Sequence, residues 1–131
     1  MADQGIALMS LASTRLDYLT QSQRVVAENV ANADTPGYEA RRTGTFSEML
    51  GGASPTRPAT TRAGHIAGLG GTSSVRVEDD PDVWDRSMDG NSVVLEQQTI
   101  RAGQIDAEYR LAANLYRKGH EFLRMAAQGT R

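Results

Sequence analysis

The fold is decided at one stretch of the sequence, Asn29-Val30-Ala31-Asn32-Ala33-Asp34-Thr35-Pro36-Gly37-Tyr38. The residue before a proline is pushed out of the helical region, so a helix that enters this stretch must end near Asp34. Pro36 presets the first central torsion of a turn, and Gly37 accepts a positive φ at the second, as a type II turn requires. The stretch therefore predicts a helix end followed by a sharp bend of the chain.

The segment before this turn has the composition of one long helix. Residues 6–32 contain no Pro or Gly and are rich in Leu, Ala, Gln and Arg, which favour helix. A seven-residue frame places seven apolar residues out of eight at its two seam positions: Met9, Ala12, Leu16, Leu19, Gln23, Val26, Val30 and Ala33. This spacing predicts a coiled-coil-like face.

A second long helix is predicted toward the other end of the chain. After the turn signal at 89–91, a helical pattern begins near Leu95 and runs to about Ala127. Its apolar face is wider than one narrow stripe and includes Ile105, Tyr109, Leu111, Ala112, Leu115, Tyr116, Phe122 and Leu123. A face of this width indicates contact with more than one partner helix.

The residues between the two helices are poor in core-forming side chains. Residues 51–74 carry six Gly, two Pro and seven Ser or Thr, with Ile66 and Leu69 as the only large aliphatics. Such a segment cannot bury enough apolar area to offset the entropy of ordering it. We expect a short helical or extended piece at 46–50 and a brief strand at 74–77.

These observations predict an all-α fold in one domain, since 131 residues would leave two separate units with thin cores. The two long helices pack as an antiparallel, coiled-coil-like pair. The predicted segments are an N-terminal helix (1–34), a turn and short segment (35–50), a flexible or partner-ordered middle (51–91) and a C-terminal helix (92–131).

Charge and composition do not favour catalysis or ligand binding. The formal charge is −2, from 14 basic and 16 acidic residues, and there is no cysteine. No basic footprint for nucleic acid is present, and no apolar stretch is long enough to span a bilayer. His65 and His120 are the only imidazoles, and they lack the paired spacing of metal ligands. We therefore expect no enzyme activity, cofactor or metal site.

Residues 29–38 closely resemble the N-terminal signature of the flagellar rod and hook family, and most of all its proximal rod type. The match is specific because ten positions combine a helix end, a turn and an aromatic residue in one order. The similarity continues through 38–50, 64–68 and 87–93. Where the family commonly carries Asp before the second helix, this chain has Val94, which cannot cap. Ser92 and Asn91 are substitute caps, so the start of that helix stays open.

The resemblance implies an axial structural protein that forms a tube transmitting torque and carrying exported subunits. It implies export by the flagellar type III apparatus without a cleaved signal, and assembly in the periplasmic rod. The implied partners are copies of itself, other rod proteins and the ring-to-rod adaptor, with the membrane ring as a further candidate. Neither nucleic-acid binding nor direct membrane insertion is expected. The family motif falls on Asn29, Asn32, Thr35, Pro36, Gly37 and Tyr38.

The helical faces are predicted to pack between subunits through Leu16, Leu19, Val26, Val30, Ile105, Tyr109, Ala112, Leu115, Tyr116, Phe122 and Leu123. Asn29 and Asn32 either form a hydrogen-bonding ladder between subunits or satisfy backbone groups near the helix end. Tyr38 is either an anchor between subunits or packs against its own helix. Two alternative functions stay open, another axial protein of the same family and an unrelated helical adaptor or binding module.

Overall fold

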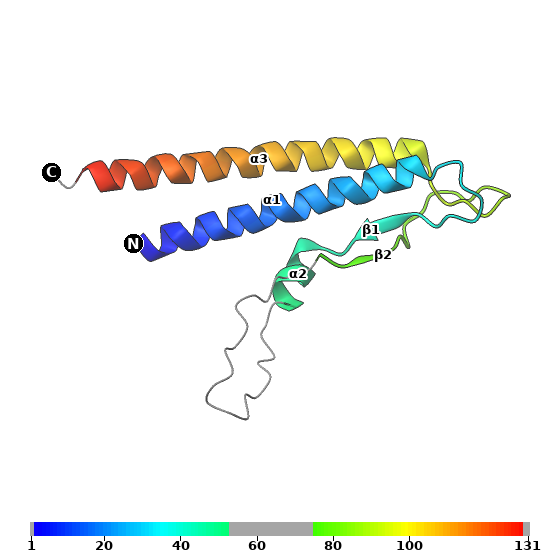
Figure 1. Cartoon of the computed structure of the whole chain (residues 1–131), viewed down its shortest axis with the longest axis horizontal. Coiled ribbons are helices and arrows are strands. Elements are labelled where there is room, and N and C mark those ends of the chain that lie inside the picture. Colours follow the sequence, from blue (N-terminus) through cyan, green and yellow to red (C-terminus); the bar gives the residue numbers. More distant parts are fainter. Residues whose placement is uncertain (1, 53–74, 130–131) are drawn as a thin grey trace, which may run out of the picture.

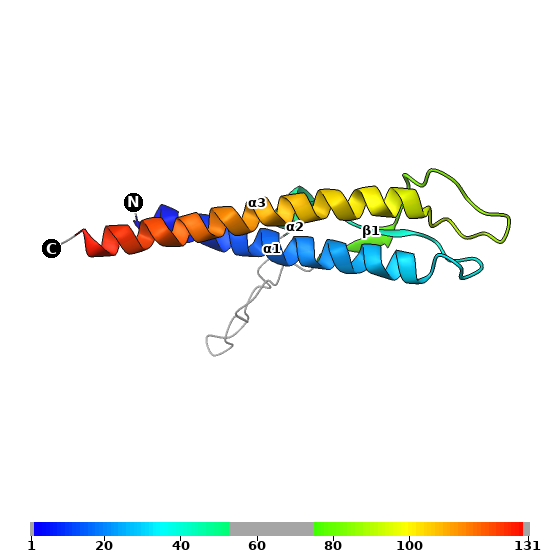
Figure 2. The same ribbon diagram turned by 90° about the horizontal axis from the view of Figure 1, so that it is seen from above.

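The structure is a computed structural model that describes residues 2–52 and 75–129. Its elements are α1 (Ala2–Ala31), β1 (Arg41–Thr43), α2 (Phe46–Gly52), β2 (Val77–Asp79) and α3 (Leu95–Gln128). The two long helices lie side by side and antiparallel, with both chain termini at the same end (Figures 1 and 2). The predicted all-α class is confirmed, with one small two-stranded sheet beside α1.

The seam between α1 and α3 is closed by small residues toward the termini. α1 begins at Ala2, inside the predicted N-terminal segment (1–34) but before the Pro- and Gly-free stretch 6–32, and therefore includes Gly5. A Cβ on Gly5 would lie 3.2 Å from Leu123, and one on Gly119 would lie 3.3 Å from Met9. The two glycines thus let each helix approach a large side chain of the other closely.

The buried face of α1 departs from the predicted seven-residue frame near the turn. Gln23 and Val30 are exposed, whereas their predecessors Ser22 and Asn29 are buried. The reason is a third layer, because β1 also packs against this half of α1. Ser22 Oγ lies 2.9 Å from Thr43 Oγ1 of that strand. The buried face therefore rotates from α3 toward β1.

β1 and β2 form an antiparallel pair with Arg42 opposite Glu78. The expected strand at 74–77 begins instead at Val77, and Ser74 lies outside the described residues. The pairing extends one residue at each end, where Asp80 N donates to Ala40 O and Gly44 N to Arg76 O, both at 2.8 Å. Register follows from these backbone bonds and from the ion pair of Arg42 with Glu78 at 3.0 Å.

The piece expected at 46–50 is helical and runs on to Gly52 as α2. Thr45 and Glu48 form a capping box in which Thr45 N donates to Glu48 Oε2 at 2.8 Å and Glu48 N donates to Thr45 Oγ1 at 3.2 Å. These hydrogen bonds lower the pKa of Glu48 below its ordinary value. On the other side, the ring of Phe46 packs 5.4 Å from that of Tyr18.

The predicted middle region is described only in part. Residues 53–74, where most of the Gly, Ser and Thr lie, are outside the described residues. Residues 75–91 carry β2 and the buried side chains of Asp80 and Asn91. This part of the middle is therefore packed against the chain's own helices and strand.

Candidate functional site

Four segments meet in a region that we call the joint, defined as residues 29–41 and 80–98. The first range holds the end of α1 and the turn that leads into β1, and the second holds the loop after β2 and the first turn of α3. At its centre Asn29 is fully buried on the last turn of α1. Its Oδ1 accepts from Arg41 N at 2.9 Å and from Tyr38 OH at 3.2 Å. Its Nδ2 donates to Arg41 O at 2.7 Å and to Gln98 Oε1 at 3.1 Å. One amide thus binds α1 to the strand after the turn and to the first turn of α3.

Two tight turns of the joint pack back to back. Tyr38 N donates to Thr35 O at 3.2 Å, and Gly37 has φ of 72°, in agreement with the predicted type II turn. In the second turn Gly90 has φ of 86°, and a Cβ there would lie 3.4 Å from Gly37 Cα. Gly37 N also donates to Asp89 O at 2.9 Å. Both positions need glycine for their torsions, and at Gly90 a side chain would press on the facing turn.

Asn91 and Ser92 bind the α1 side of the joint and do not cap α3. Asn91 Nδ2 donates to Asn32 O at 2.9 Å and to Thr35 O at 2.8 Å, so each of these carbonyls at the end of α1 and in its turn accepts a second hydrogen bond besides its backbone one. Ser92 Oγ accepts from Ala40 N at 2.8 Å. α3 begins at Leu95 after Val94, with no side-chain hydrogen bond at its cap. The start of the second long helix, which the sequence left open, is therefore Leu95.

The first turns of α3 bring further polar groups into the joint. Gln97 Nε2 donates to Asp82 O at 2.7 Å. The carboxylate of Asp80 is fully buried and forms an ion pair with Arg101, whose side chain keeps 23% of its exposure. A buried carboxylate needs such a partner, because desolvation alone would penalise its charge. The β2 end is therefore held to α3 by charge as well as by hydrogen bonds.

Tyr38 contributes a neutral donor at every physiological pH. Burial is the largest cause that raises its pKa above the ordinary value, and the nearby Arg41 opposes the shift. The hydroxyl packs against its own helix through Asn29. Asn32 likewise stays within the chain, donating to Glu28 O at 2.8 Å and accepting from Thr35 Oγ1 at 3.2 Å. All six motif residues therefore lie within the joint.

The predicted packing residues fall into three groups by exposure. Leu19, Val26 and Ala112 are buried in the chain's own seam. Partly exposed side chains flank them: Leu16, Ile105, Tyr116 and Leu123. The remaining members are between 43% and 65% exposed: Val30, Tyr109, Leu115 and Phe122. Only the partly exposed and the exposed groups have enough accessible surface to contact another molecule.

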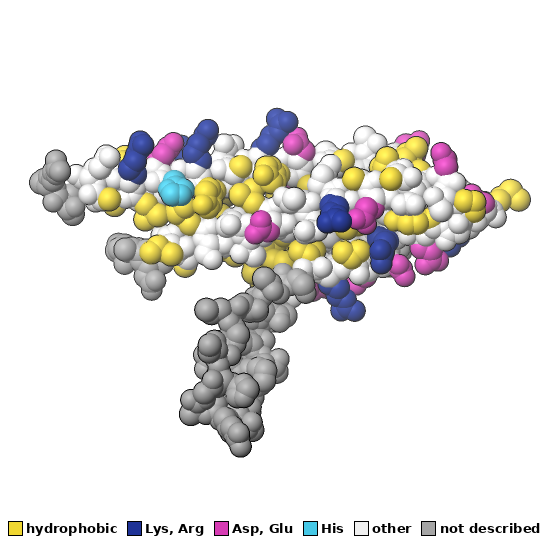
Figure 3. All heavy atoms as spheres, in the orientation of Figure 1, with side chains coloured by type: hydrophobic (Ala, Val, Ile, Leu, Met, Phe, Trp, Pro, Cys, Tyr) yellow, Lys and Arg dark blue, Asp and Glu magenta, His cyan; other side chains and the backbone are white. Residues whose placement is uncertain are grey.

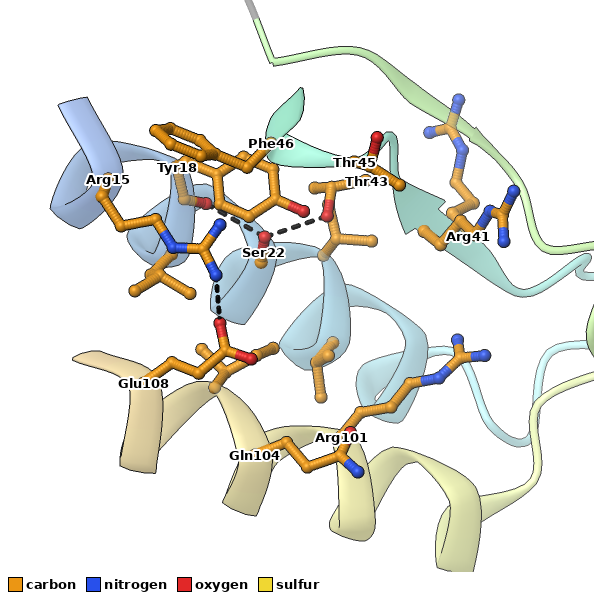
Figure 4. Close-up of a pocket in the computed structure, with 15 residues that line it drawn as sticks. Arg15, Tyr18, Ser22, Arg41, Thr43, Thr45, Phe46, Arg101, Gln104 and Glu108 are labelled. Carbon is orange, nitrogen blue, oxygen red and sulfur yellow. Dashed lines mark hydrogen bonds and ion pairs between the residues drawn. The ribbon is translucent and has the colours of Figure 1, made fainter. Parts of the chain in front are cut away.

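A groove of about 410 Å³ opens between α1, α3 and the β1–α2 segment. Its lining includes the apolar side chains of Leu19, Val26 and Ile105. Arginines from three segments also line it, and Figure 4 labels Arg15 of α1, Arg41 of β1 and Arg101 of α3. Arg15 crosses one end, where it pairs with Glu108 of α3 and lies 4.7 Å from the ring of Phe46. Sequence reasoning missed this groove, because it depends on where the β1–α2 segment packs.

Nothing in the described part of the chain resembles a catalytic or metal centre. No group of three or more His, Cys, Asp or Glu side chains there is placed to hold a metal ion. His120 is exposed, and its ring meets that of Tyr116 edge to face with the ring centres 5.4 Å apart, whereas His65 lies outside the described residues. The chemistry of the joint is that of backbone capping and amide pairing, which suits a mechanical connection.

Comparison with known proteins identifies a family whose model covers α1 and the turn that follows it. The model of the family described as Flagella basal body rod protein matches residues 9–38, which span most of α1 and the Pro36–Gly37 turn. The chain is 31% identical over 128 residues to the flagellar basal body rod protein FlgB of Agrobacterium fabrum, covering 95% of this chain and 96% of that protein.

Two further relatives carry the same description. The chain is 30% identical over 124 residues to FlgB of Escherichia coli, covering 86% of each protein. It is also 30% identical over 126 residues to FlgB of Salmonella typhimurium, covering 85% of this chain and 86% of that protein. Similarity of this extent, together with the signature in α1 and its turn, shows that the chain belongs to the FlgB family of flagellar basal body rod proteins.

Proposed function

We propose that this chain, a structural subunit of the flagellar basal-body rod, polymerises through the exposed faces of its two terminal helices. The polymer is the tube that transmits torque and carries exported subunits. One observation carries the proposal, a stripe of large apolar side chains on the outer face of α3: Leu111, Leu115, Phe122 and Met125. We call these four residues the outer stripe.

The outer stripe is separate from the seam that closes the subunit. Its members are 55% to 65% exposed, whereas Ala112 beside them is buried against α1. Spacings of four, seven and three residues keep all four on one side of a helix. Leu8 and Leu11 of α1 are also exposed, and Figure 3 shows hydrophobic side chains on both helices toward the chain termini. Apolar surface of this extent on a small chain indicates a protein interface.

The joint gives the subunit the stiffness that such a role needs. Asn29 makes four side-chain hydrogen bonds, and Asn91 donates two more to the end of α1 and its turn, so the helices cannot change their relative position without breaking a connected set. Load applied to one helix is therefore passed to the other and to β1. The joint thus supports a proposal in which each subunit acts as a rigid strut in the wall of the tube.

The proposed partners are further copies of this chain, other rod proteins, the ring-to-rod adaptor and the membrane ring. We propose export by the flagellar type III apparatus without a cleaved signal, and residence in the periplasmic part of the rod, with no enzymatic role. Within the described residues, no helix is both long enough and apolar enough to cross a membrane. The relatives support the rod location through their names.

The test compares Leu115→Asp with Asn114→Asp on the same exposed helix. A carboxylate buried between subunits costs several kcal/mol unless it takes up a proton. We expect the Leu115→Asp protein to be exported but to leave basal bodies without complete rods, whereas the Asn114→Asp strain swims. Complete rods built from the Leu115→Asp protein would show that the outer stripe faces solvent and would overturn the proposal.

A further inference from the structure

The groove between α1, α3 and the β1–α2 segment has room for one large side chain. Its volume is about 410 Å³, and Leu19, Val26 and Ile105 are among its apolar lining residues. An aromatic side chain on a loop fits both the volume and the apolar lining.

The chain carries one such side chain on a projecting loop. We call residues 81–90 the tip loop, which lies beyond the joint-side ends of α1 and α3 (Figures 1 and 2). Trp84, the single tryptophan of the sequence, is 62% exposed there, and Met88 is fully exposed. An indole has a large apolar area, so its burial against a partner would be favourable. The tip loop therefore presents an aromatic side chain that can insert into a partner surface.

Charge favours a match between these two surfaces. The groove lining carries four arginines against Glu108, and the exposed Arg41 makes no ion pair within the described residues. In the tip loop, Asp85 follows Trp84 directly and also makes no ion pair with any described residue. An acidic group beside the inserting ring meets a basic group beside the opening, which fixes orientation as well as attraction.

We infer that Trp84 of one copy inserts into the groove of a second copy, with Asp85 facing Arg41. The inference rests on the proposed function, because it names one contact by which the subunits polymerise. Trp84 is not among the residues lining its own groove, so the contact forms between copies. A tip on one surface and a groove on another make a heterologous contact, and repetition of such a contact builds a ring or an open helical polymer.

The groove also supplies partners for the polar edge and the faces of the indole. The indole N–H needs an acceptor when buried, and Gln104 and Glu108 stand at the α3 rim. Arg15 already lies over the rings of Phe46 and Tyr18, at 4.7 Å and 5.2 Å from their centres. A third ring would extend this stack, in which guanidinium and aromatic faces attract each other.

The absence of cysteine from the sequence allows a direct test by disulfide trapping. Two differently tagged chains, Ser87→Cys in the tip loop and Gln104→Cys at the groove rim, are expressed together as the only source of the subunit. Basal bodies are isolated and oxidised. Both positions are exposed and leave Trp84 intact. The matched control replaces Gln104→Cys with Ser13→Cys, which is exposed on the opposite side of α1 from Ser22 of the groove.

We expect the Ser87–Gln104 pair to give at least about tenfold more mixed disulfide than the control pair, because a fixed contact raises the local concentration of the two thiols. Trapping that does not exceed the control in rods that contain both chains would overturn the inference and leave the proposed function standing. Failure of the proposed function is a different result, in which the unmodified chain is missing from isolated rods.

A charge exchange gives a second readout that does not depend on cysteine variants. Arg41→Asp and Asp85→Arg should each reduce swimming, and the chain that carries both should recover it, since the pair then meets with reversed sign. Trp84→Phe should retain more motility than Trp84→Ser, because the phenyl ring still fills the groove. Equal motility of the two Trp84 variants, or no recovery in the charge exchange, would contradict the inserted arrangement.

Discussion

The joint and the open end of the helix pair, where both chain termini lie, differ in which kinds of side chain they bury and expose. In the joint every buried side chain except that of Ala40 is polar, with Asn29 and Gln98 at 0% exposure. At the open end, large apolar side chains are exposed, with Leu111 at 62% and Phe122 at 65%. Polar groups buried with partners fix one arrangement within the chain, whereas apolar groups left in water favour association between chains. The comparison separates the hydrogen-bonded groups of the joint, which fix the shape of the subunit, from the exposed apolar side chains of the open end and of the tip loop, which we propose join subunits.

The largest effect on stability is expected from Asn29→Leu in the joint. The substitution leaves the N–H and C=O of Arg41, the hydroxyl of Tyr38 and the Gln98 carbonyl without their partner. Buried groups left unpaired should lower the free energy of unfolding by about 3–5 kcal/mol. Urea unfolding followed by circular dichroism measures the loss. Asn114→Leu, at an exposed position of α3, is the control and should change it by less than about 0.5 kcal/mol.

A somewhat smaller loss is expected from Arg101→Met, which removes the partner of the buried Asp80. The unpaired carboxylate should cost about 2–3 kcal/mol, less than a fully buried pair because Arg101 keeps some exposure. Adding Asp80→Asn in the same chain should restore most of the loss, since an amide has no charge to compensate. The same urea measurement applies, and a double variant no more stable than Arg101→Met alone would show that the charge is not the cause.

Glycine substitutions should change stability with opposite signs in the joint and within α3. Gly37→Ala forces a side chain to adopt φ of 72° and should destabilise the joint by about 1–2 kcal/mol. Gly103→Ala lies within α3 with open space around it, and should stabilise the chain by about 0.5–1 kcal/mol because alanine favours helix. The difference between the two unfolding midpoints is the measured quantity. Destabilisation by Gly103→Ala would mean that α3 has a contact at this position.

The smallest effect on the fold is expected at the open end. Phe122→Gln removes an apolar side chain that the subunit does not bury, so unfolding should change by less than about 0.5 kcal/mol. Its effect should appear in self-association, measured by sedimentation over a range of concentrations. A variant that unfolds easily but associates as before would reverse the roles assigned to the two ends.

The long helices and the turn between 35 and 38 are readable from the sequence. Proline, glycine and helix-forming composition act locally, so the predicted start near Leu95 and the predicted end near Asp34 lie close to the observed bounds, Leu95 and Ala31. α2 was readable too, because Thr45 and Glu48 have the spacing of a capping box. This spacing was sufficient to predict a helix, although our prediction for 46–50 was only a helical or extended piece.

The contacts within the joint could not be predicted from local sequence patterns. Asn29 and Gln98 are 69 positions apart, and their contact depends on the antiparallel register of the two helices. The seven-residue frame placed Val30 on the seam, but β1 packs beside α1 and rotates the buried face to Asn29. Asn91 was considered as a cap for α3, whereas it binds carbonyls at the end of α1. Such pairings follow from tertiary packing, which local patterns do not contain.

The antiparallel arrangement of α1 and α3 also has an electrostatic consequence. Each helix carries a macrodipole of about half a unit charge at either end, positive at its N-terminus. With helices of 30 and 34 residues side by side and reversed, the two dipoles nearly cancel in every subunit. In a wall of like-oriented subunits, uncancelled dipoles would lie parallel and repel their lateral neighbours. The paired helices remove this repulsion, so that the wall can be built from any number of identical units without accumulating an axial field.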